Sequence, residues 1–200
     1  MKQSVTAFAP ATVANVGCGY DIFGFAIEEP GDIVQVSPSD MAGVRISEIN
    51  GDNGRLPKEA ELNTAGFAVI RFLEQIKSSQ GINLKLIKQL PLGSGMGSSA
   101  ASSVAALIAV NYLFDEPMQK TELLTIAMKA EKLACGAAHA DNVAPALFGG
   151  FILIREINPP DVIELPVPEN LYCTIIHPEI EIKTLDARKI IEPYILLPDA

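Results

Sequence analysis

Hydrophobic and polar residues alternate along several short stretches of the chain, which is the pattern of half-buried β-strands. This pattern and the turn residues around it predict strands over residues 4–9, 22–27, 33–36, 43–49, 82–87, 151–155 and 171–176. The runs 22–27 and 33–36 flank Pro30-Gly31, a turn-forming dipeptide, so a hairpin is predicted there. Residues 10–21 are rich in Gly, Pro and Asn and are predicted to form a loop.

Helical spacing of apolar residues predicts a helix over residues 63–79, with Asn63 as its N-cap and Gly81 as its stop. Three further helical segments are predicted: one from Ser98 onward, one over residues 121–134 ending at Gly136, and one over residues 184–191. The intervening segment HADNVAPALFGG is predicted to be a loop with one helical turn.

The order of these elements indicates the fold class. Hairpin-linked strands mixed with helices favour an α+β fold over a regular doubly wound sheet. A length of 200 residues corresponds to one domain, or to one domain and part of a second. The proline-rich segment NPPDVIELPVPEN, residues 158–170, is the best candidate for a domain boundary.

Charge and cysteine content exclude several functional classes. The chain has 24 acidic and 15 basic residues, a net charge of −9, so it is a poor candidate for binding nucleic acid or an anionic membrane surface. Cys18, Cys135 and Cys173 lack the spacing of a disulfide framework or a zinc site. With no secretory leader and no apolar run approaching ~18 residues, we expect a cytoplasmic protein.

The glycine–serine stretch PLGSGMGSSAA is the clearest chemical signal in the sequence. Small residues let the backbone approach an anion, and the first turn of a helix offers free N–H groups at the positive end of its dipole. No G-K-[ST] follows, and Ser98 stands where a dinucleotide fingerprint has its third glycine. The nearest upstream base is Lys88, so a bound phosphate would need backbone N–H groups and Mg²⁺. A flexible strand-to-helix turn is the alternative interpretation.

Several segments carry a family resemblance. PLGSGMGSSAAS resembles the central ATP-binding motif of the GHMP kinases, and APATVANVGCGYD resembles their N-terminal motif. The segments ANVGCGYDIFGFA, HADNVAPALFGGF and IEIKTLDARKI are similar to the homoserine kinase branch of that superfamily, and the match runs to about Ile191. The superfamily's third, C-terminal Gly-rich motif has no counterpart before Ala200, so we expect the chain to be C-terminally truncated and to turn over poorly by itself.

The resemblance implies a fold and an activity. The fold would be the GHMP-kinase N-terminal domain, which is ribosomal protein S5 domain 2-like, over residues 1–167, followed by the start of a ferredoxin-like C-terminal domain over residues 168–200. The activity would be ATP-dependent phosphorylation of L-homoserine to O-phospho-L-homoserine, a step of threonine biosynthesis. ATP as co-substrate, Mg²⁺ and a homodimer of the full-length protein are implied as well.

The resemblance also implies residue roles. ATP would be bound by Pro91, Leu92, Gly93, Ser94, Gly95, Met96, Gly97, Ser98, Ser99, Ala100 and Ala101, together with Asn63. The amino-acid substrate would be bound by Asn15, Asp21, His139, Asp141, Thr184 and Arg188, with Arg188 clamping its carboxylate. Asn142, Asp141 and Glu131 would be the catalytic group, and Ser99 and Glu131 would hold the metal ion.

Structural interpretations of these residues stay open. Asp21 is typical of turns, Asp141-Asn142 is typical of a helix N-cap, and Asn63 is fully explained as a cap. Glu131 and Arg188 are typical of solvated helix faces. A GHMP kinase with a mevalonate-type acceptor, and a nucleotide-binding fragment without catalytic activity, are the alternative functions.

Overall fold

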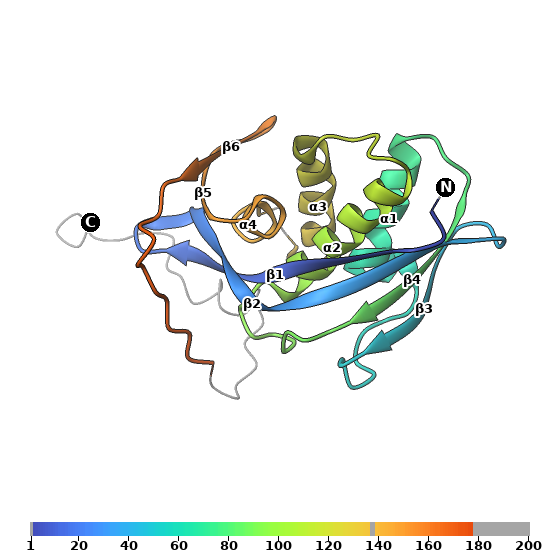
Figure 1. Cartoon of the computed structure of the whole chain (residues 1–200), viewed down its shortest axis with the longest axis horizontal. Coiled ribbons are helices and arrows are strands. Elements are labelled where there is room, and N and C mark those ends of the chain that lie inside the picture. Colours follow the sequence, from blue (N-terminus) through green and yellow to red (C-terminus); the bar gives the residue numbers. More distant parts are fainter. Residues whose placement is uncertain (1, 137–138, 178–200) are drawn as a thin grey trace.

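The computed structural model describes residues 2–136 and 139–177, in which six strands form one sheet beside a layer of helices (Figure 1). The elements are β1 (Val5–Val16), β2 (Gly19–Ser39), β3 (Val44–Asn50), the short 3-10 helix η1 (Ala60–Leu62), α1 (Thr64–Gln75), β4 (Gly81–Ile87), α2 (Ser98–Leu113), α3 (Lys120–Cys135), α4 (Val143–Phe148), β5 (Phe151–Ile157) and β6 (Pro160–Leu165). The predicted α+β class is confirmed.

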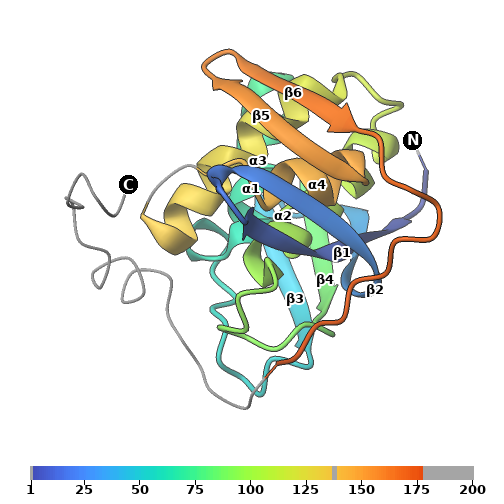
Figure 2. The same cartoon turned by 90° about the vertical axis from the view of Figure 1, so that its left-hand side faces the viewer.

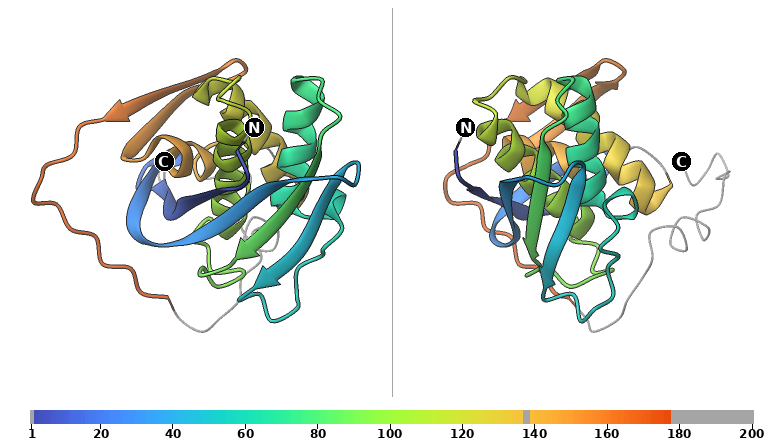
Figure 3. Two further views of the ribbon diagram at one scale, coloured as in Figure 1. Left: turned by 45° about the vertical axis from the view of Figure 1, so that its right-hand side comes forward. Right: turned by 90° about the vertical axis from the view of Figure 1, so that its right-hand side faces the viewer.

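The sheet has the order β3-β4-β2-β5-β6, and β1 pairs with β2 beside this path. All pairings are antiparallel except β3 with β4. Strand β2 connects the two halves of the sheet, because its end at residues 33–39 pairs with β4 and its start at residues 23–25 pairs with β5. Figure 3 shows β2 bending along its length.

Helix α2 packs against β1 and β2 of the sheet and against the helices α1, α3 and α4. It is buried along nearly its whole length, which its many alanines permit because they need little space. Leu107 and Leu113 of α2, Phe72 of α1 and Leu124 of α3 are fully buried and form the centre of the core. Within the described residues no helix is long and apolar enough to cross a membrane.

The first predicted loop and the predicted hairpin are both wrong. Residues 10–21 belong mostly to β1 and β2, which are joined by a tight turn at Gly17. Pro30 and Gly31 lie inside β2, and Gly31 pairs with Pro10 of β1. A Cβ at Gly31 would collide with the carbonyl oxygen of Ala9, so the glycine permits close strand pairing here and does not make a turn.

The remaining sequence predictions concern the ends of the helices and the C-terminal segments of the chain. As predicted, Asn63 caps α1, α2 begins at Ser98, and Gly136 ends α3. The predicted helix stop at Gly81 is wrong, because α1 ends at Gln75 and Gly81 is the first residue of β4. Within the proline-rich segment, residues 160–165 form β6, which pairs with β5, and the domain boundary there stays a prediction. Residues 171–176 form no strand; this stretch runs along the outside of the molecule (Figure 2). The predicted helix 184–191 lies outside the described residues.

Candidate active site

The glycine–serine loop connects β4 to the N-terminus of α2, as the sequence predicts. Gly93, Gly95 and Gly97 all have positive φ, between 66° and 73°, a region that residues with a Cβ enter only at a cost. Gly97 is the N-cap of α2 and has no side chain to offer, so the first N–H groups of the helix stay open to a ligand. The loop therefore has the backbone chemistry of an anion cradle.

A buried ion pair holds both ends of this loop. The Lys88 amine contacts the Asp32 carboxylate, and both side chains are almost completely buried. Lys88 Nζ also donates to the carbonyl oxygen of Ser98 at 3.0 Å, just after the loop. Asp32 Oδ1 accepts from the backbone N–H groups of Gln89 and Leu90, just before the loop. Burial lowers the pKa of Lys88, although the charge of Asp32 partly opposes this effect.

Ser99 and Glu131 lie side by side, although 32 residues separate them in the sequence. Ser99 Oγ, in the first turn of α2, donates to Glu131 Oε2 of α3 at 2.8 Å, and Glu131 is 5% exposed. The neighbouring Ser98 Oγ is buried and has no hydrogen-bond partner among the described residues. A carboxylate and hydroxyl groups at the edge of an anion cradle fit the oxygen ligands that Mg²⁺ takes beside phosphates.

A second cluster gathers Asp21, His139 and Asp141, with their ligand atoms within 4.8 Å of one another. Asp21 Oδ1 lies 3.3 Å from His139 Nδ1. Asn15 supports this group, because its Oδ1 accepts from the Asp21 N–H at 3.0 Å and both residues have positive φ. Asp21 is thus part of a side-chain cluster, and it lies near the start of β2 at a position with positive φ.

Asp141 is the most buried member of this cluster. It is 2% exposed, and its Oδ1 has no hydrogen-bond partner among the described residues. Burial, followed by the charge of Asp21, raises the pKa of Asp141 to about 6, although His139 opposes the shift. Two carboxylates and an imidazole around one point would stabilise a cationic group, and an ammonium group is one such cation.

Asn142 lies between the cradle and the acidic cluster. Its Oδ1 accepts from Thr12 Oγ1 at 2.7 Å. A Cβ placed on Gly97 would lie 2.9 Å from the same Oδ1 and would collide with Thr12. Asn142 is the N-cap residue of α4 by position, but its side chain makes no capping hydrogen bond. The N-cap interpretation is therefore wrong for the Asn142 side chain, and Thr12 is a site residue that the sequence interpretation missed.

Asn63 serves the fold. Its Oδ1 accepts from the Ala65 N–H at 3.1 Å, its Nδ2 donates to the Pro57 carbonyl at 3.0 Å, and the residue is 4% exposed. Its role in binding nucleotide stays a prediction. Thr184 and Arg188 lie outside the described residues, so their predicted contacts with an amino acid also stay predictions.

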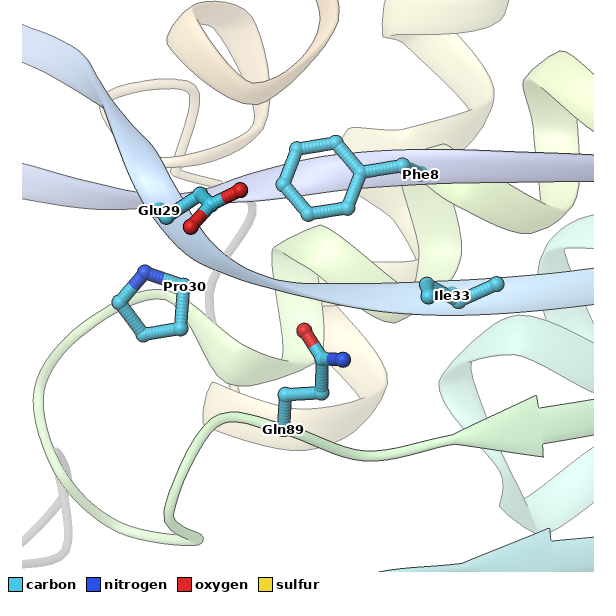
Figure 4. A pocket seen from close by; sticks show the side chains of 5 residues that line it. All are labelled: Phe8, Glu29, Pro30, Ile33 and Gln89. Carbon is cyan, nitrogen blue, oxygen red and sulfur yellow. The ribbon is translucent and has the colours of Figure 1, made fainter.

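A surface hollow of about 440 Å³ lies between β1, the middle of β2 and the chain after β4, where Gln89 hydrogen-bonds Asp32 of the buried ion pair. Figure 4 shows its lining by Phe8, Glu29, Pro30, Ile33 and Gln89. None of these is a predicted site residue, and the one charged group among them is acidic. The hollow does not offer the chemistry of a phosphate site.

Residues 63–150 match the family model described as the GHMP kinases N terminal domain. A homoserine kinase of Chlorobium phaeobacteroides is 49% identical over 99% of this chain and 65% of its own length. One of Chloroherpeton thalassium is 50% identical over 100% of the chain and 66% of its own length. The chain therefore spans about 65% of the length of the curated relatives that it matches.

Solved structures give the same match. The crystal structure of homoserine kinase from Cytophaga hutchinsonii has a TM-score of 0.94 and 56% identity, over 99% of this chain and 63% of that one. The mevalonate kinase of Methanococcus jannaschii has a TM-score of 0.65 at 16% identity, over 81% of this chain and 56% of that one, which is a likeness of fold alone.

Proposed function

We propose that this chain, which belongs to the GHMP kinases, provides the ATP site and much of the acceptor site of a homoserine kinase. The observation that carries the proposal is the adjacency of an anion cradle and a cation-binding acidic cluster, with Asn142 between them. An enzyme that phosphorylates an amino acid needs both, because one substrate is a polyanion and the other bears an ammonium group. Similarity to homoserine kinases over the whole chain supports the same acceptor.

The triphosphate of ATP would lie along the loop of residues 91–97 and the first turn of α2. Backbone N–H groups there would bind its oxygens, and the loop would be kept in shape by Asp32 and Lys88. Ser99 and Glu131 would hold Mg²⁺. The Ser98 hydroxyl, which has no hydrogen-bond partner among the described residues, would also be available to a ligand. When bound there, Mg²⁺ would neutralise part of the negative charge of the phosphates.

The acceptor would enter from the side of the acidic cluster. Asp21 and Asp141, with His139 and Asn15 beside them, would hold the ammonium group of L-homoserine. By resemblance to homoserine kinases, Arg188 would clamp the substrate carboxylate, and Thr184 would also contact the substrate. Asn142, next to Gly97, would orient the acceptor hydroxyl toward the γ-phosphorus, together with Asp141.

The transfer needs alignment more than a strong base, because phosphoryl transfer passes through a loose transition state. A bond forms between the hydroxyl oxygen and the γ-phosphorus as the bond to the bridging oxygen breaks. ADP leaves with that electron pair, and the hydroxyl proton passes to an oxygen of the transferred group. Glu131 would act in this step only through the metal ion that it holds.

Further parts of the proposal rest on the family resemblance. They are a homodimer, a cytoplasmic location, and a division at residue 167 between an ATP-binding domain and the start of a second domain. A mevalonate-type acceptor is the second candidate, and it is less favoured because mevalonate has a carboxylate and no ammonium group. Two aspartates beside that acceptor would repel it.

The test uses the chain completed with the C-terminal part of the Cytophaga hutchinsonii homoserine kinase that it does not match. The completed enzyme is incubated with ATP, Mg²⁺ and, separately, L-homoserine, L-serine, mevalonate or galactose, and phosphorylated products are detected by ³¹P NMR. We expect rapid phosphorylation of L-homoserine. Activity on mevalonate with none on homoserine would overturn the acceptor assignment.

Glu131→Gln is the control variant for the metal site. It keeps the size of the side chain but removes the charge that would hold Mg²⁺, so kcat is expected to fall on the order of 100-fold. If wild type binds ATP but phosphorylates none of the alcohols, the chain belongs to a nucleotide-binding protein without kinase activity.

A further inference from the structure

Thr12 is a buried residue of β1 that contacts both sides of the site. It is 1% exposed. Its backbone N–H donates to the carbonyl oxygen of Met96, in the glycine loop, at 3.1 Å. Its hydroxyl donates to Asn142 Oδ1 at 2.7 Å. One residue thus ties the cradle to the loop that carries the acidic cluster.

The hydroxyl contact also determines which way the Asn142 carboxamide faces. A carboxamide has an oxygen that accepts hydrogen bonds and a nitrogen that donates two. With Oδ1 held by Thr12, Nδ2 is the end left to contact a ligand. The Thr12 hydroxyl is buried, so losing this hydrogen bond would leave the hydroxyl unpaired at a cost, and its pairing with the half-buried Asn142 carboxamide is favoured.

We propose that Thr12 is a positioning residue, whose hydroxyl fixes the Asn142 carboxamide so that its Nδ2 donates toward the reacting end of the site. The inference rests on the proposed kinase function. Nδ2 donates to the acceptor oxygen or to an oxygen of the γ-phosphoryl group, both of which accept hydrogen bonds. Asn142 takes no proton in the transfer, which agrees with a reaction that needs no strong base.

Thr12→Val is the first variant, because valine keeps the branched shape and the backbone N–H to Met96 but has no hydroxyl. We expect kcat to fall about 10- to 100-fold, the range of a lost buried hydrogen bond. The KM values for ATP and for the acceptor should change less than about threefold. Thr12→Ser keeps a hydroxyl and should retain at least about half of the wild-type kcat.

A double-mutant cycle separates positioning from general damage to the fold. If Thr12 acts through Asn142, Thr12→Val should lower kcat little or not at all in an Asn142→Ala background. If Thr12→Val lowers kcat by the same factor in both backgrounds, the inference is wrong. Thr12→Ala provides a second cycle if the valine variant does not fold.

A measurement without turnover keeps this inference separate from the proposed function. The side-chain amide of Asn142 is followed by ¹⁵N NMR in the free enzyme. Its signals should shift in Thr12→Val and stay close to wild type in Thr12→Ser, and unchanged signals in Thr12→Val would overturn the inference. If the enzyme phosphorylates an alcohol other than homoserine, the acceptor assignment is wrong. The double-mutant cycle of Thr12 and Asn142 is then measured with that alcohol and still tests the inference.

Discussion

Asp141→Asn is predicted to make the protein more stable at neutral pH. The wild-type carboxyl is 2% exposed, and one of its oxygens has no hydrogen-bond partner among the residues described. Burial and the charge of Asp21 raise the pKa of Asp141 to about 6 from its ordinary 3.8. Asparagine has nearly the same shape as aspartate but no charge, so the substitution removes the buried negative charge that destabilises the folded protein.

The size of the effect follows from linkage. A rise of the pKa from 3.8 to about 6 corresponds to about 3 kcal/mol of folding free energy, at about 1.36 kcal/mol per unit of pKa shift. The folded pKa is above the unfolded one, so the protonated carboxyl favours the folded state. Its contribution is complete below pH 3.8 and is lost as pH rises through about 6. The variant should exceed wild type by up to about 3 kcal/mol at pH 7.5 and by little at pH 4.

Urea unfolding followed by circular dichroism, from pH 4 to pH 8, measures the free energy of unfolding of both proteins. Asp40→Asn is the control variant, because Asp40 is exposed and outside the site. The charges that face Asp141 are those of Asp21, His139 and Glu131, and all three stay in place in the variant. A stability difference that does not change with pH, or a variant less stable at pH 7.5, would refute the reasoning.

The same variant should lose function. An ammonium group beside Asp141 would favour its ionised form, so binding of an amino acid should lower the pKa of this carboxyl and recover part of the energy. Asp141→Asn removes that attraction, and calorimetry should show weaker binding of L-homoserine together with unchanged binding of ATP. An acidic group that costs stability without ligand is typical of a binding site.

Three further substitutions test the glycine loop and its support. Lys88→Met leaves the Asp32 carboxylate buried without its partner, so the free energy of unfolding should fall by about 3–5 kcal/mol; a loss below about 1 kcal/mol in urea unfolding would show that water reaches the pair. Gly97→Ala places a Cβ against Thr12 at a positive φ, whereas Gly95→Ala has a similar φ but open space around it. Each should cost about 1–2 kcal/mol from backbone strain, and only Gly97→Ala should also lower kcat, by more than about tenfold; equal effects on kcat would contradict the close packing at Gly97.

Local signals in the sequence predicted the starts of α1 and α2 and the end of α3. Asn63 as N-cap, the helix start at Ser98 and the stop at Gly136 all depend on a few neighbouring residues, and the structure has all three. The β1–β2 pair depends on distant contacts. Gly31 is needed because β1 comes close to it, and a sequence pattern cannot distinguish that need from the need of a turn.

The buried ion pair of Asp32 and Lys88 follows a pattern that is visible in the sequence. Residues Ile82, Leu84 and Leu86 of β4 point into the core, and alternation puts Lys88 at the next inward position. On β2, inward Val34 is preceded two residues earlier by Asp32. Opposite charges at inward positions of two strands predict a buried pair once the strands are known to be neighbours.

The pairs that form the site could not be derived from spacing. Ser99 and Glu131 are 32 residues apart, and Thr12 and Asn142 are 130 apart. Only the family resemblance brought Ser99 and Glu131 together before the structure did. Thr12 could not be predicted because a single threonine in a strand is common. It belongs to the site because Asn142 and Gly97 pack against it.

The neutral character of Thr12 and Asn142 follows from what lies on either side of them. In the proposed site, the cradle would attract phosphates and the acidic cluster would attract a cation, with Asn142 close to both. A lysine at the junction would be drawn toward Asp21 and Asp141 and would repel the ammonium group of the acceptor. A carboxylate there would repel the γ-phosphoryl group. A carboxamide held in one orientation would donate to the reacting oxygens without attracting one substrate more than the other, so at this position the direction of a hydrogen bond would take the place of charge.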